Sequence, residues 1–384
     1  FDSGSTHFAS MKKDQGFWPA TMYLEGLDQY RGWFQSSLLT AVGAFGEGAP
    51  FKECVTHGWT VDGEGRAMHK SLGNGVDPAD IFNENGADIL RLWAASADYH
   101  ADVRCSKAIF QQLSQNYLKF RNTCKFMLDN LVDFDPAHLT KAEDMPVLDR
   151  WLITKLNELI EKVEQSYNDY EFHIITHAVN DFCVTTLSSF YLDIVKDRLY
   201  CEAADSAERR SAQTALYLTL STLAKLFAPI LAFTCDEIWL AMPHTAEDDA
   251  RNVVLNDMNK PFTAYALDAE TMARWEHIIE VRTAVNGALE EARAAKVIGK
   301  SLEADVHLTV PEGDVFLADE NPAALADLFI VSKVELTVGG ELAVKVENAA
   351  GTKCPRCWKH SLTPNAEGLC PRCAEVVRHL PDLL

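Results

Sequence analysis

Long apolar runs are missing from this 384-residue sequence. No stretch approaches the about 20 apolar residues that a membrane-spanning helix needs, so we expect no contact with a membrane. The start also lacks the features of a signal peptide. The first residue is Phe1 instead of a methionine, in a segment that reads as the end of a strand. We therefore expect the sequence to be a piece of a longer protein.

Positive charge is scarce, because 35 Lys and Arg residues stand against 56 Asp and Glu residues, a net charge of −21. This balance excludes a protein whose surface is coated with basic groups for non-specific nucleic-acid binding, but it leaves room for a local site. From Lys353 to the end, five basic residues outnumber three acidic ones, a net charge of +2. This asymmetry is a weak hint that the tail meets a polyanion, and on charge alone a solvated surface is the better interpretation.

Ten cysteines are present, and six of them lie singly among apolar residues. Scattered thiols of this kind are typical of buried cysteines in a reducing compartment, which favours the cytoplasm. The six are Cys54, Cys105, Cys124, Cys183, Cys201 and Cys235.

The other four cysteines form two CxxC pairs, Cys354 with Cys357 and Cys370 with Cys373, separated by a loop of twelve residues. This spacing predicts one tetrahedral zinc ion per chain, held by four thiolates. Because four thiolates leave no open position on the metal, the ion should be structural, and the small ribbon should unfold without it. Two disulfides are the alternative, which the reducing pattern of the other six cysteines disfavours.

The chain reads as several domains with different periodicities. An α/β region with short apolar runs comes first, and Asp77 followed by Pro78 marks a helix start there, with Gly86 as the next break. Apolar stripes at helical spacing follow, and then a two-residue alternation that predicts strands. We expect an α/β region over 1–85, a connecting helical fold over 86–148, a helical bundle over 149–300, a small α+β module over 301–350 and a zinc ribbon over 351–384.

A glycine-rich loop at residues 63–75 carries Lys70 between flexible glycines. A lysine on such a loop is ordinarily a solvated surface charge. Alternatively, a movable ammonium group can approach phosphate oxygens as negative charge develops on them during attack by a carboxylate on ATP.

The segment from Ala67 to Ser71, continued by Leu72, Gly73 and Asn74, resembles the KMSKS signature of the class I aminoacyl-tRNA synthetases. It departs from the signature at Ala67 and His69. Further segments, among them "YLEGLDQYRGWFQSSLL", "GADILRLWAAS", "KVIGKSLEA" and the closing cysteine pairs, resemble in order the C-terminal part of the bacterial isoleucyl family of that class. The resemblance covers essentially the whole chain.

This resemblance implies a Rossmann-type catalytic remnant over 1–85 that handles isoleucine, ATP and Mg²⁺. It implies catalytic roles for Lys70 and Ser71, with Lys70 contacting ATP and the transition state. The implied nucleotide and adenylate site contains Glu25, Gly26, Asp28, Gln29, Met68, His69 and Lys70.

The resemblance also implies that the bundle contacts the anticodon stem-loop of tRNA(Ile), with the zinc tail holding the anticodon end, in a protein that acts as a monomer. Trp358 is a candidate for stacking on a base, although such a tryptophan often packs in its own small core. Arg356, Lys359 and Arg372 are better suited to phosphates, which position RNA without reading its sequence.

Two family features are absent from this sequence: the His-x-Gly-His motif and the inserted editing domain. The segment His57-Gly58 is followed by Trp59 and is no substitute. We therefore expect the chain alone to be inactive in isoleucine activation and proofreading. Two alternatives stay open: a valyl or leucyl enzyme of the same class, and a non-catalytic tRNA-binding zinc protein, which the departures at Ala67 and His69 favour.

Overall fold

The computed structural model describes residues 2–314, 316–317 and 320–380, and the side chains of these residues apart from that of Lys70. It divides into two units. The first consists of residues 1–118 together with 166–177, and the second of residues 119–165 together with 178–384. In the described residues, no helix combines the length and the apolar character that crossing a membrane requires.

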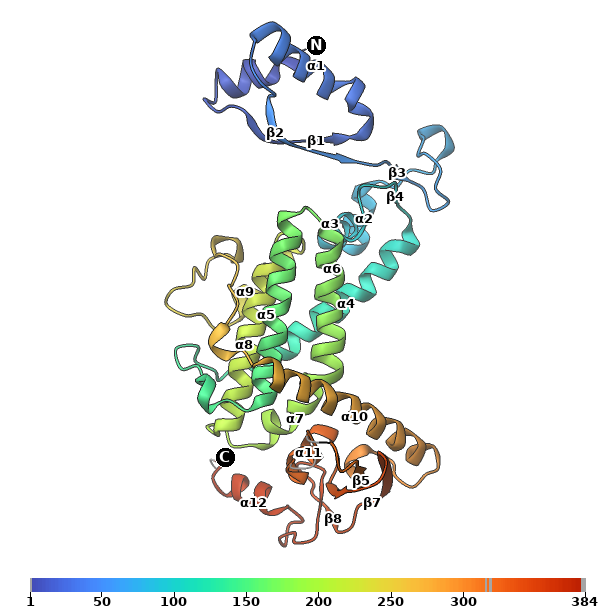
Figure 1. Ribbon diagram of the computed structural model, residues 1–384, viewed down its shortest axis with the longest axis vertical. Coiled ribbons are helices and arrows are strands. Elements are labelled where there is room, and N and C mark those ends of the chain that lie inside the picture. The colour runs from blue at the N-terminus through green and yellow to red at the C-terminus, as the bar shows by residue number, and fades with distance from the viewer. Residues whose placement is uncertain (1, 315, 318–319, 381–384) are drawn as a thin grey trace. The chain divides into compact units, whose positions relative to one another are not determined.

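The first unit begins with a parallel strand pair, β1 (Ala20–Gly26) and β2 (Phe51–His57), connected through helix α1 (Trp33–Leu39), as Figure 1 shows in blue. Parallel neighbours need such a crossover. Short helical turns flank α1, namely η3 (Leu27–Arg31) and η4 (Thr40–Ala44). The aromatic rings of Tyr23 and Trp33 stack at 4.4 Å in the core of this region.

The expected strand end at the start of the chain is wrong, because residues 3–12 are helical: η1 (Ser3–Ser5) and η2 (His7–Lys12). The physical reason is local bonding. His7 is fully buried, and its Nδ1 lies 2.9 Å from the carbonyl oxygen of Gly4, three residues earlier. Indole Nε1 of Trp33 also donates to the carbonyl of Ser3 (3.0 Å), which fixes this turn against α1.

Strands β3 (Thr60–Val61) and β4 (Val103–Arg104) form a second parallel pair. Helices α2 (Pro78–Asn85) and α3 (Ala87–Ser96) lie between these two strands in the sequence. The predicted helix start is confirmed, because the Asp77 side chain accepts a hydrogen bond from the backbone of Ala79. The predicted break is confirmed too. Gly86 separates the two helices with a φ of 87°, which glycine adopts more readily than other residues.

Long helices make up most of the following 190 residues, and Figure 1 shows them in green to orange. Helix α8 lies at the centre of the second unit, since nearly all of its residues from Ser211 to Phe227 are buried. A turn at residues 228–231, which contains Pro229, separates α8 from the next helix. The helices are α4 (Lys107–Asp129), α5 (Val147–Asn168), α6 (Phe172–Asp181), the π-helical η7 (Phe182–Tyr191), α7 (Leu192–Cys201), α8 (Ala207–Phe227), α9 (Ala232–Ala241) and α10 (Ala269–Ala294), with short turns η5 (Lys70–Leu72), η6 (Ala142–Asp144), η8 (Val253–Leu255) and η9 (Thr263–Tyr265).

A buried carboxylate connects three of these helices. Asp149 of α5 is fully buried and accepts hydrogen bonds from both terminal nitrogens of Arg198 on α7 (2.8 and 2.9 Å). It also accepts from the hydroxyls of Tyr191 (2.8 Å) and Ser211 on α8 (2.5 Å). Because a buried charge is tolerated only when it is paired and hydrogen-bonded, this network fixes how α5, α7 and α8 pack.

A small module follows α10, built from a three-stranded sheet in the order β6-β5-β7. Strand β5 (Ala304–Val310) alternates buried and half-buried residues, as its sequence predicts. It pairs in parallel with β6 (Lys333–Val338) and antiparallel with β7 (Ala343–Asn348). The parallel connection is helix α11 (Pro322–Phe329), which sequence reasoning did not predict as a helix, and a short turn η10 (Ser301–Glu303) precedes the sheet.

The last described segment, residues 351–380, is named here the cysteine module. It contains the short antiparallel pair β8 (Thr352–Lys353) and β9 (His360–Ser361), followed by helix α12 (Pro371–Arg378). Its apolar core is minimal: Leu369, Ala374 and Val377 pack around the cysteines. Such a core is too small to hold the module together alone.

Candidate functional site

The residues of the predicted adenylate site lie at the carboxyl end of β1. Gly26 is opposite His57 at the end of β2, and this end of a parallel pair is where α/β folds bind ligands. The carboxylate of Glu25 is exposed and accepts a hydrogen bond from its neighbour's N–H, the backbone of Gly26 (3.0 Å). A Cβ at Gly26 would lie 2.9 Å from Oδ1 of Asp28, so a larger residue there would have to move the Asp28 side chain.

Gln29 has a structural task in this turn. Its side-chain oxygen accepts a hydrogen bond from the backbone N–H of Trp33 (2.8 Å), at the start of α1. Its side-chain nitrogen donates weakly to Asp28 (3.4 Å). Asp28 and Gln29 are half-buried, so this turn is held in shape while Glu25 remains accessible to a ligand.

The glycine loop, residues 63–75, is closed by a buried carboxylate that the sequence reasoning missed. Asp62 is 4% exposed and accepts hydrogen bonds from the backbone (2.8 Å) and Nε (2.8 Å) of Arg66. Asn74 Nδ2 donates to the same carboxylate (2.9 Å). The hydrogen bonds from Asn74 and from the Arg66 backbone lower the pKa of Asp62 to about 2.

Asn74 reaches across the loop to the signature residues. Its side-chain oxygen accepts from the backbone N–H of His69 (2.9 Å), and its side-chain nitrogen donates to the carbonyl of Ala67 (3.1 Å). Asp62 and Asn74 together are named here the Asp62–Asn74 clasp. An aspartate directly after a strand and an asparagine closing a glycine loop were the signals that could have revealed it.

The structure places the predicted signature residues on this clasped loop. Met68 is half-buried against a core cluster that contains Ile81 and Phe110. His69 and Ser71 are exposed. The backbone of Lys70 begins the turn η5, and its side chain lies outside the described part of the structure.

The four predicted metal ligands converge. The sulfur atoms of Cys354, Cys357, Cys370 and Cys373 all lie within 4.8 Å of one another, and three of these residues are buried. Two of the sulfurs, those of Cys357 and Cys370, are 3.7 Å apart. A tetrahedral zinc ion with Zn–S bonds of about 2.3 Å needs sulfurs about 3.8 Å apart, so the cluster fits such an ion.

The chemistry of the thiols also fits a cation. Burial by itself would raise the pKa of Cys354, but the backbone N–H groups of Cys357, Cys370 and Arg356 donate hydrogen bonds that lower it. Burial raises the pKa of Cys357, and the neighbouring thiols add to this effect. Four thiolates therefore need a bound cation to be ionised together.

The three basic residues predicted to meet phosphates are all engaged inside the protein. Arg372 donates to both oxygens of Asp197 (2.5 and 2.8 Å) and to Glu202 (2.8 Å). Arg356 donates to backbone carbonyls at the end of α7, and Lys359 pairs with Asp327. This is a correction to the sequence prediction, because the module uses these cations to attach itself.

Trp358 has the opposite character, since the residue is 52% exposed and is not part of the small core of the module. Its backbone is in the left-handed region with a φ of 66°, which costs energy for a residue other than glycine and is common at functional positions. The ammonium of Lys300 lies 5.0 Å from the centre of the ring. Two other tryptophans of the helices lie deeper: Trp239 is fully buried and Trp275 is half-buried.

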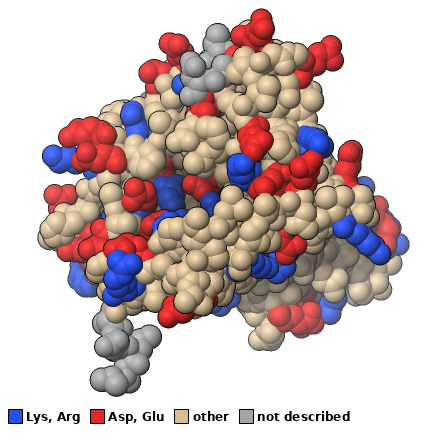
Figure 2. Space-filling view, turned by 90° about the horizontal axis from the view of Figure 1, so that it is seen from below, with Lys and Arg blue, Asp and Glu red and all other residues tan. Residues whose placement is uncertain are grey.

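The face of the molecule in Figure 2 shows scattered basic groups among more numerous acidic ones. This distribution agrees with the net charge of −21. Contacts with a polyanion would therefore have to be local.

Comparison with known families defines the class. Residues 1–106 match the family described as tRNA synthetases class I (I, L, M and V), and residues 149–308 match the anticodon-binding domain of tRNA ligase. The chain belongs to the class I tRNA synthetases and joins part of their catalytic region to an anticodon-binding domain.

Curated relatives of similar sequence are isoleucine–tRNA ligases. The isoleucine–tRNA ligase of Moorella thermoacetica is 47% identical over 99% of this chain and 43% of its own length. That of Syntrophotalea carbinolica is 47% identical over 98% of this chain and 42% of its own length. The chain thus spans less than half the length of the isoleucine–tRNA ligases that it matches.

Solved structures share the fold at low identity. A LeuRS crystallised with tRNA and LeuAMS from Agrobacterium radiobacter matches 91% of this chain and 36% of that one, with a TM-score of 0.56 and 15% identity. The methionyl-tRNA synthetase of Mycobacterium tuberculosis matches 61% of this chain and 46% of that one, with a TM-score of 0.51 and 20% identity.

Proposed function

We propose that this chain is the C-terminal part of an isoleucine–tRNA ligase, which activates isoleucine with ATP to an adenylate and transfers it to tRNA(Ile). The observation that carries the proposal is the 47% identity to isoleucine–tRNA ligases over nearly the whole chain. Because more than half of the length of these relatives lies outside the chain, we do not expect the chain alone to form the adenylate.

In the proposed reaction, the isoleucine carboxylate attacks the α-phosphorus of ATP, and Mg²⁺-bound pyrophosphate leaves. Lys70 supplies a positive charge to the phosphate oxygens as their negative charge grows, and Ser71 supplies a hydroxyl beside it. Only interactions that are stronger in the transition state than in the ground state accelerate such a step. A lysine on a loop that closes during the reaction meets this requirement.

The loop geometry supports this proposal. The Asp62–Asn74 clasp holds the backbone of Ala67 and His69, and so orients the turn on which Lys70 begins. Met68 anchors the same turn in an apolar cluster. His69 and Met68 would lie against the nucleotide, while the residue that replaces the first signature lysine, Ala67, adds no charge.

Glu25 and its neighbours form the proposed adenylate-binding turn. Glu25 is the first choice to bind the α-ammonium group of the amino acid, because its carboxylate is exposed at the carboxyl end of a parallel strand. Gly26 lets the chain approach the ligand closely, and Asp28 and Gln29 shape the turn next to the ribose.

The four cysteines hold one zinc ion in this proposal. The fit of the sulfur geometry to a tetrahedral site supports it, and a set of four thiolates leaves no position for a substrate. The ion is therefore structural. Its role is to fold the cysteine module, whose apolar core is small.

The helical bundle and the cysteine module bind tRNA(Ile) in this proposal, and the protein acts as a cytoplasmic monomer. The exposed ring of Trp358 is available to stack on an unpaired base. None of the ten cysteines forms a disulfide in the described structure, which is compatible with a reducing compartment.

A non-catalytic tRNA-binding protein is the second candidate, and the observation that favours it is the loss of two signature residues at Ala67 and His69. A valyl or leucyl enzyme is the other alternative. One assay distinguishes both alternatives from the main proposal.

That assay is exchange of pyrophosphate into ATP by the intact synthetase that carries this chain, with isoleucine, valine or leucine as the amino acid. We expect isoleucine to support the fastest exchange. Preference for valine or leucine would reassign the enzyme within its class. No exchange with any amino acid, combined with retained tRNA binding, would favour the non-catalytic protein.

A further inference from the structure

The attachment of the cysteine module to the rest of the second unit is strongly polar. Four cations on the module meet oxygen atoms on three other elements. Arg356 and Arg372 bind the end of α7, Lys359 binds Asp327 of α11, and Lys353 pairs with Glu303 of η10 (3.4 Å). Each of the two cysteine pairs therefore carries one arginine that binds α7. Arg356 lies inside the first CxxC pair, and Arg372 lies inside the second.

Arg356 connects the metal ligands directly to the helix. Its Nη1 lies 3.7 Å from the sulfur of Cys373 and also donates to the carbonyl of Cys201, the last residue of α7. Its Nη2 donates to the carbonyl of Tyr200 (3.4 Å). The last carbonyls of a helix have no partner within the helix and carry partial negative charge, so a guanidinium group is well suited to bind them.

Arg372 neutralises the same end of α7 from the other side. It binds Asp197 through two parallel hydrogen bonds and also binds Glu202, which follows the helix. Without this arginine, two carboxylates would stand uncompensated at the end of α7. Paired guanidinium and carboxylate groups of this geometry are the strong form of such a contact.

Arg356 and Asp197, one from each of these two contacts, line a cavity of about 530 Å³, named here the α7 groove. One wall comes from α7 and includes Lys196 and Tyr200, and the other comes from the module and includes Trp358. The residues Tyr200 and Trp358 are 57% and 52% exposed, so both are accessible to a planar ligand. The groove exists only while the module is docked on α7.

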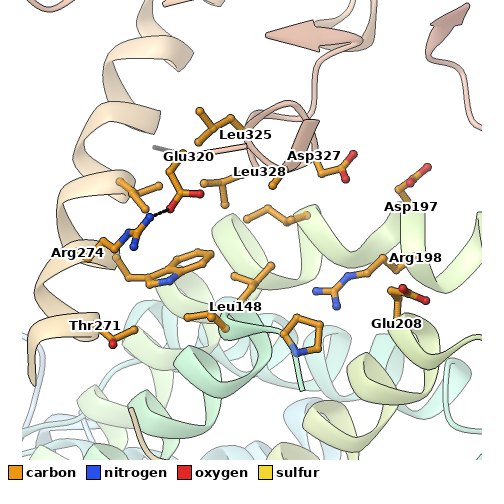
Figure 3. A pocket seen from close by; sticks show the side chains of 16 residues that line it. Leu148, Asp197, Arg198, Glu208, Thr271, Arg274, Glu320, Leu325, Asp327 and Leu328 are labelled. Carbon is orange, nitrogen blue, oxygen red and sulfur yellow. Dashed lines mark hydrogen bonds and ion pairs between the residues drawn. The ribbon is translucent and has the colours of Figure 1, made fainter. Parts of the chain in front are cut away.

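The acidic residues of the groove are compensated by the same contacts. Asp197 and Asp327 also line the neighbouring cavity of about 500 Å³, where Figure 3 shows them on one side, coming from α7 and α11. Asp197 is bound by Arg372 and Asp327 by Lys359. Lys196 in turn pairs with Asp193 (2.8 Å). A phosphate group entering the groove would therefore meet neutralised carboxylates.

We propose that Arg356 and Arg372 are positioning residues that transmit the folding of the metal-bound module to the end of α7, and thereby hold the α7 groove in a form that accepts RNA. This inference rests on the proposed function, because it takes tRNA as the ligand. Arg372 lies outside the lining of the groove and acts on it through α7, whereas Arg356 lines the groove and also holds the carbonyls at the end of α7.

The test replaces Arg372 by Gln in the intact synthetase and measures zinc content, tRNA(Ile) affinity and pyrophosphate exchange. We expect one zinc per chain, unchanged exchange and a tRNA dissociation constant raised about tenfold. Arg378→Gln is the matched control, since Arg378 lies on the same helix and pairs only with exposed Glu375 in the described structure. The control should bind tRNA like the unmodified enzyme.

A charge swap separates positioning from general disruption. The double variant Asp197→Arg with Arg372→Asp restores an ion pair of opposite polarity and should recover most of the tRNA affinity. Affinity that is unchanged in Arg372→Gln, or a loss that the swap does not reverse, would overturn the inference. Failure of the unmodified enzyme to bind tRNA(Ile) at all would instead overturn the proposed function.

Discussion

The glycine loop and the cysteine module are held in shape by different kinds of interaction. Both are short polar segments with little apolar surface of their own. The loop is closed by the Asp62–Asn74 clasp, which consists only of hydrogen bonds. The module is closed by four cysteines suited to one metal ion and is attached by four cations.

This difference matches what each region has to do. Hydrogen bonds of a clasp cost little to break and reform, which allows a loop to open and close during a reaction. A metal site with four thiolates contributes folding energy outright and does not open in each cycle. Under the proposed function, we therefore expect the loop to move and the module to stay rigid.

The largest expected effect is on the loop. Lys70→Ala in the intact synthetase should lower the rate of isoleucine-dependent pyrophosphate exchange by roughly 10²- to 10³-fold, the usual cost of removing one group that stabilises transition-state charge. Lys52→Ala is the control, because Lys52 is an exposed lysine on β2. An exchange rate for Lys70→Ala equal to that of the control would remove Lys70 from the chemistry.

The next effect concerns the module. Cys373→Ser should lose the single zinc ion and unfold residues 351–380, because the remaining apolar core is small. Metal analysis and hydrogen exchange would measure this, with Cys54→Ser as a control at an exposed cysteine of the first unit. A Cys373→Ser variant that has lost its metal but keeps residues 351–380 protected from hydrogen exchange would contradict the idea that the metal holds the module together.

A smaller effect is expected at the clasp. Asn74→Ala removes hydrogen bonds to Asp62, Ala67 and His69 and should destabilise the closed loop locally by about 1–3 kcal/mol. Faster hydrogen exchange confined to residues 62–74, together with a raised KM for ATP, would show this. Asn85→Ala on helix α2 is the control, and equal exchange in both variants would argue against the clasp.

The smallest effect depends on pH. The pKa of Asp62 is about 2 in the folded chain and about 3.9 in an unfolded one. Because its folded pKa is depressed, its contribution to stability is complete above about pH 4 and is lost as the pH falls towards 2. Unfolding free energies measured from pH 5 to 2.5 should therefore fall more steeply for the unmodified chain than for Asp62→Asn. Parallel curves would contradict the assignment.

Much of the fold followed from periodicity and end signals. The cap at Asp77 and the break at Gly86 could be predicted because each has a local cause in one or two residues. The alternation in residues 304–310 gave strand β5 for the same reason. Helix α11 was missed because its eight residues are nearly all apolar and so show no periodicity.

The candidate site could be predicted in part. Spacing alone located the four cysteines, since metal ligands follow a regular pattern along the chain. The partners of Arg356 and Arg372 could not be predicted, because Asp197 and Cys201 are more than 150 residues away in sequence. Charge alone suggested phosphates for these arginines, and only the fold shows the carboxylates and carbonyls that they bind instead.

The most direct test of the comparison is steady-state aminoacylation of tRNA(Ile) by the intact synthetase, with tRNA as the varied substrate. The Lys70→Ala and Cys373→Ser variants are measured side by side. The account predicts that Lys70→Ala lowers kcat with little change in KM for tRNA, whereas Cys373→Ser raises KM for tRNA. A raised KM in Lys70→Ala, or an unchanged KM in a Cys373→Ser enzyme that has lost its zinc, would contradict it.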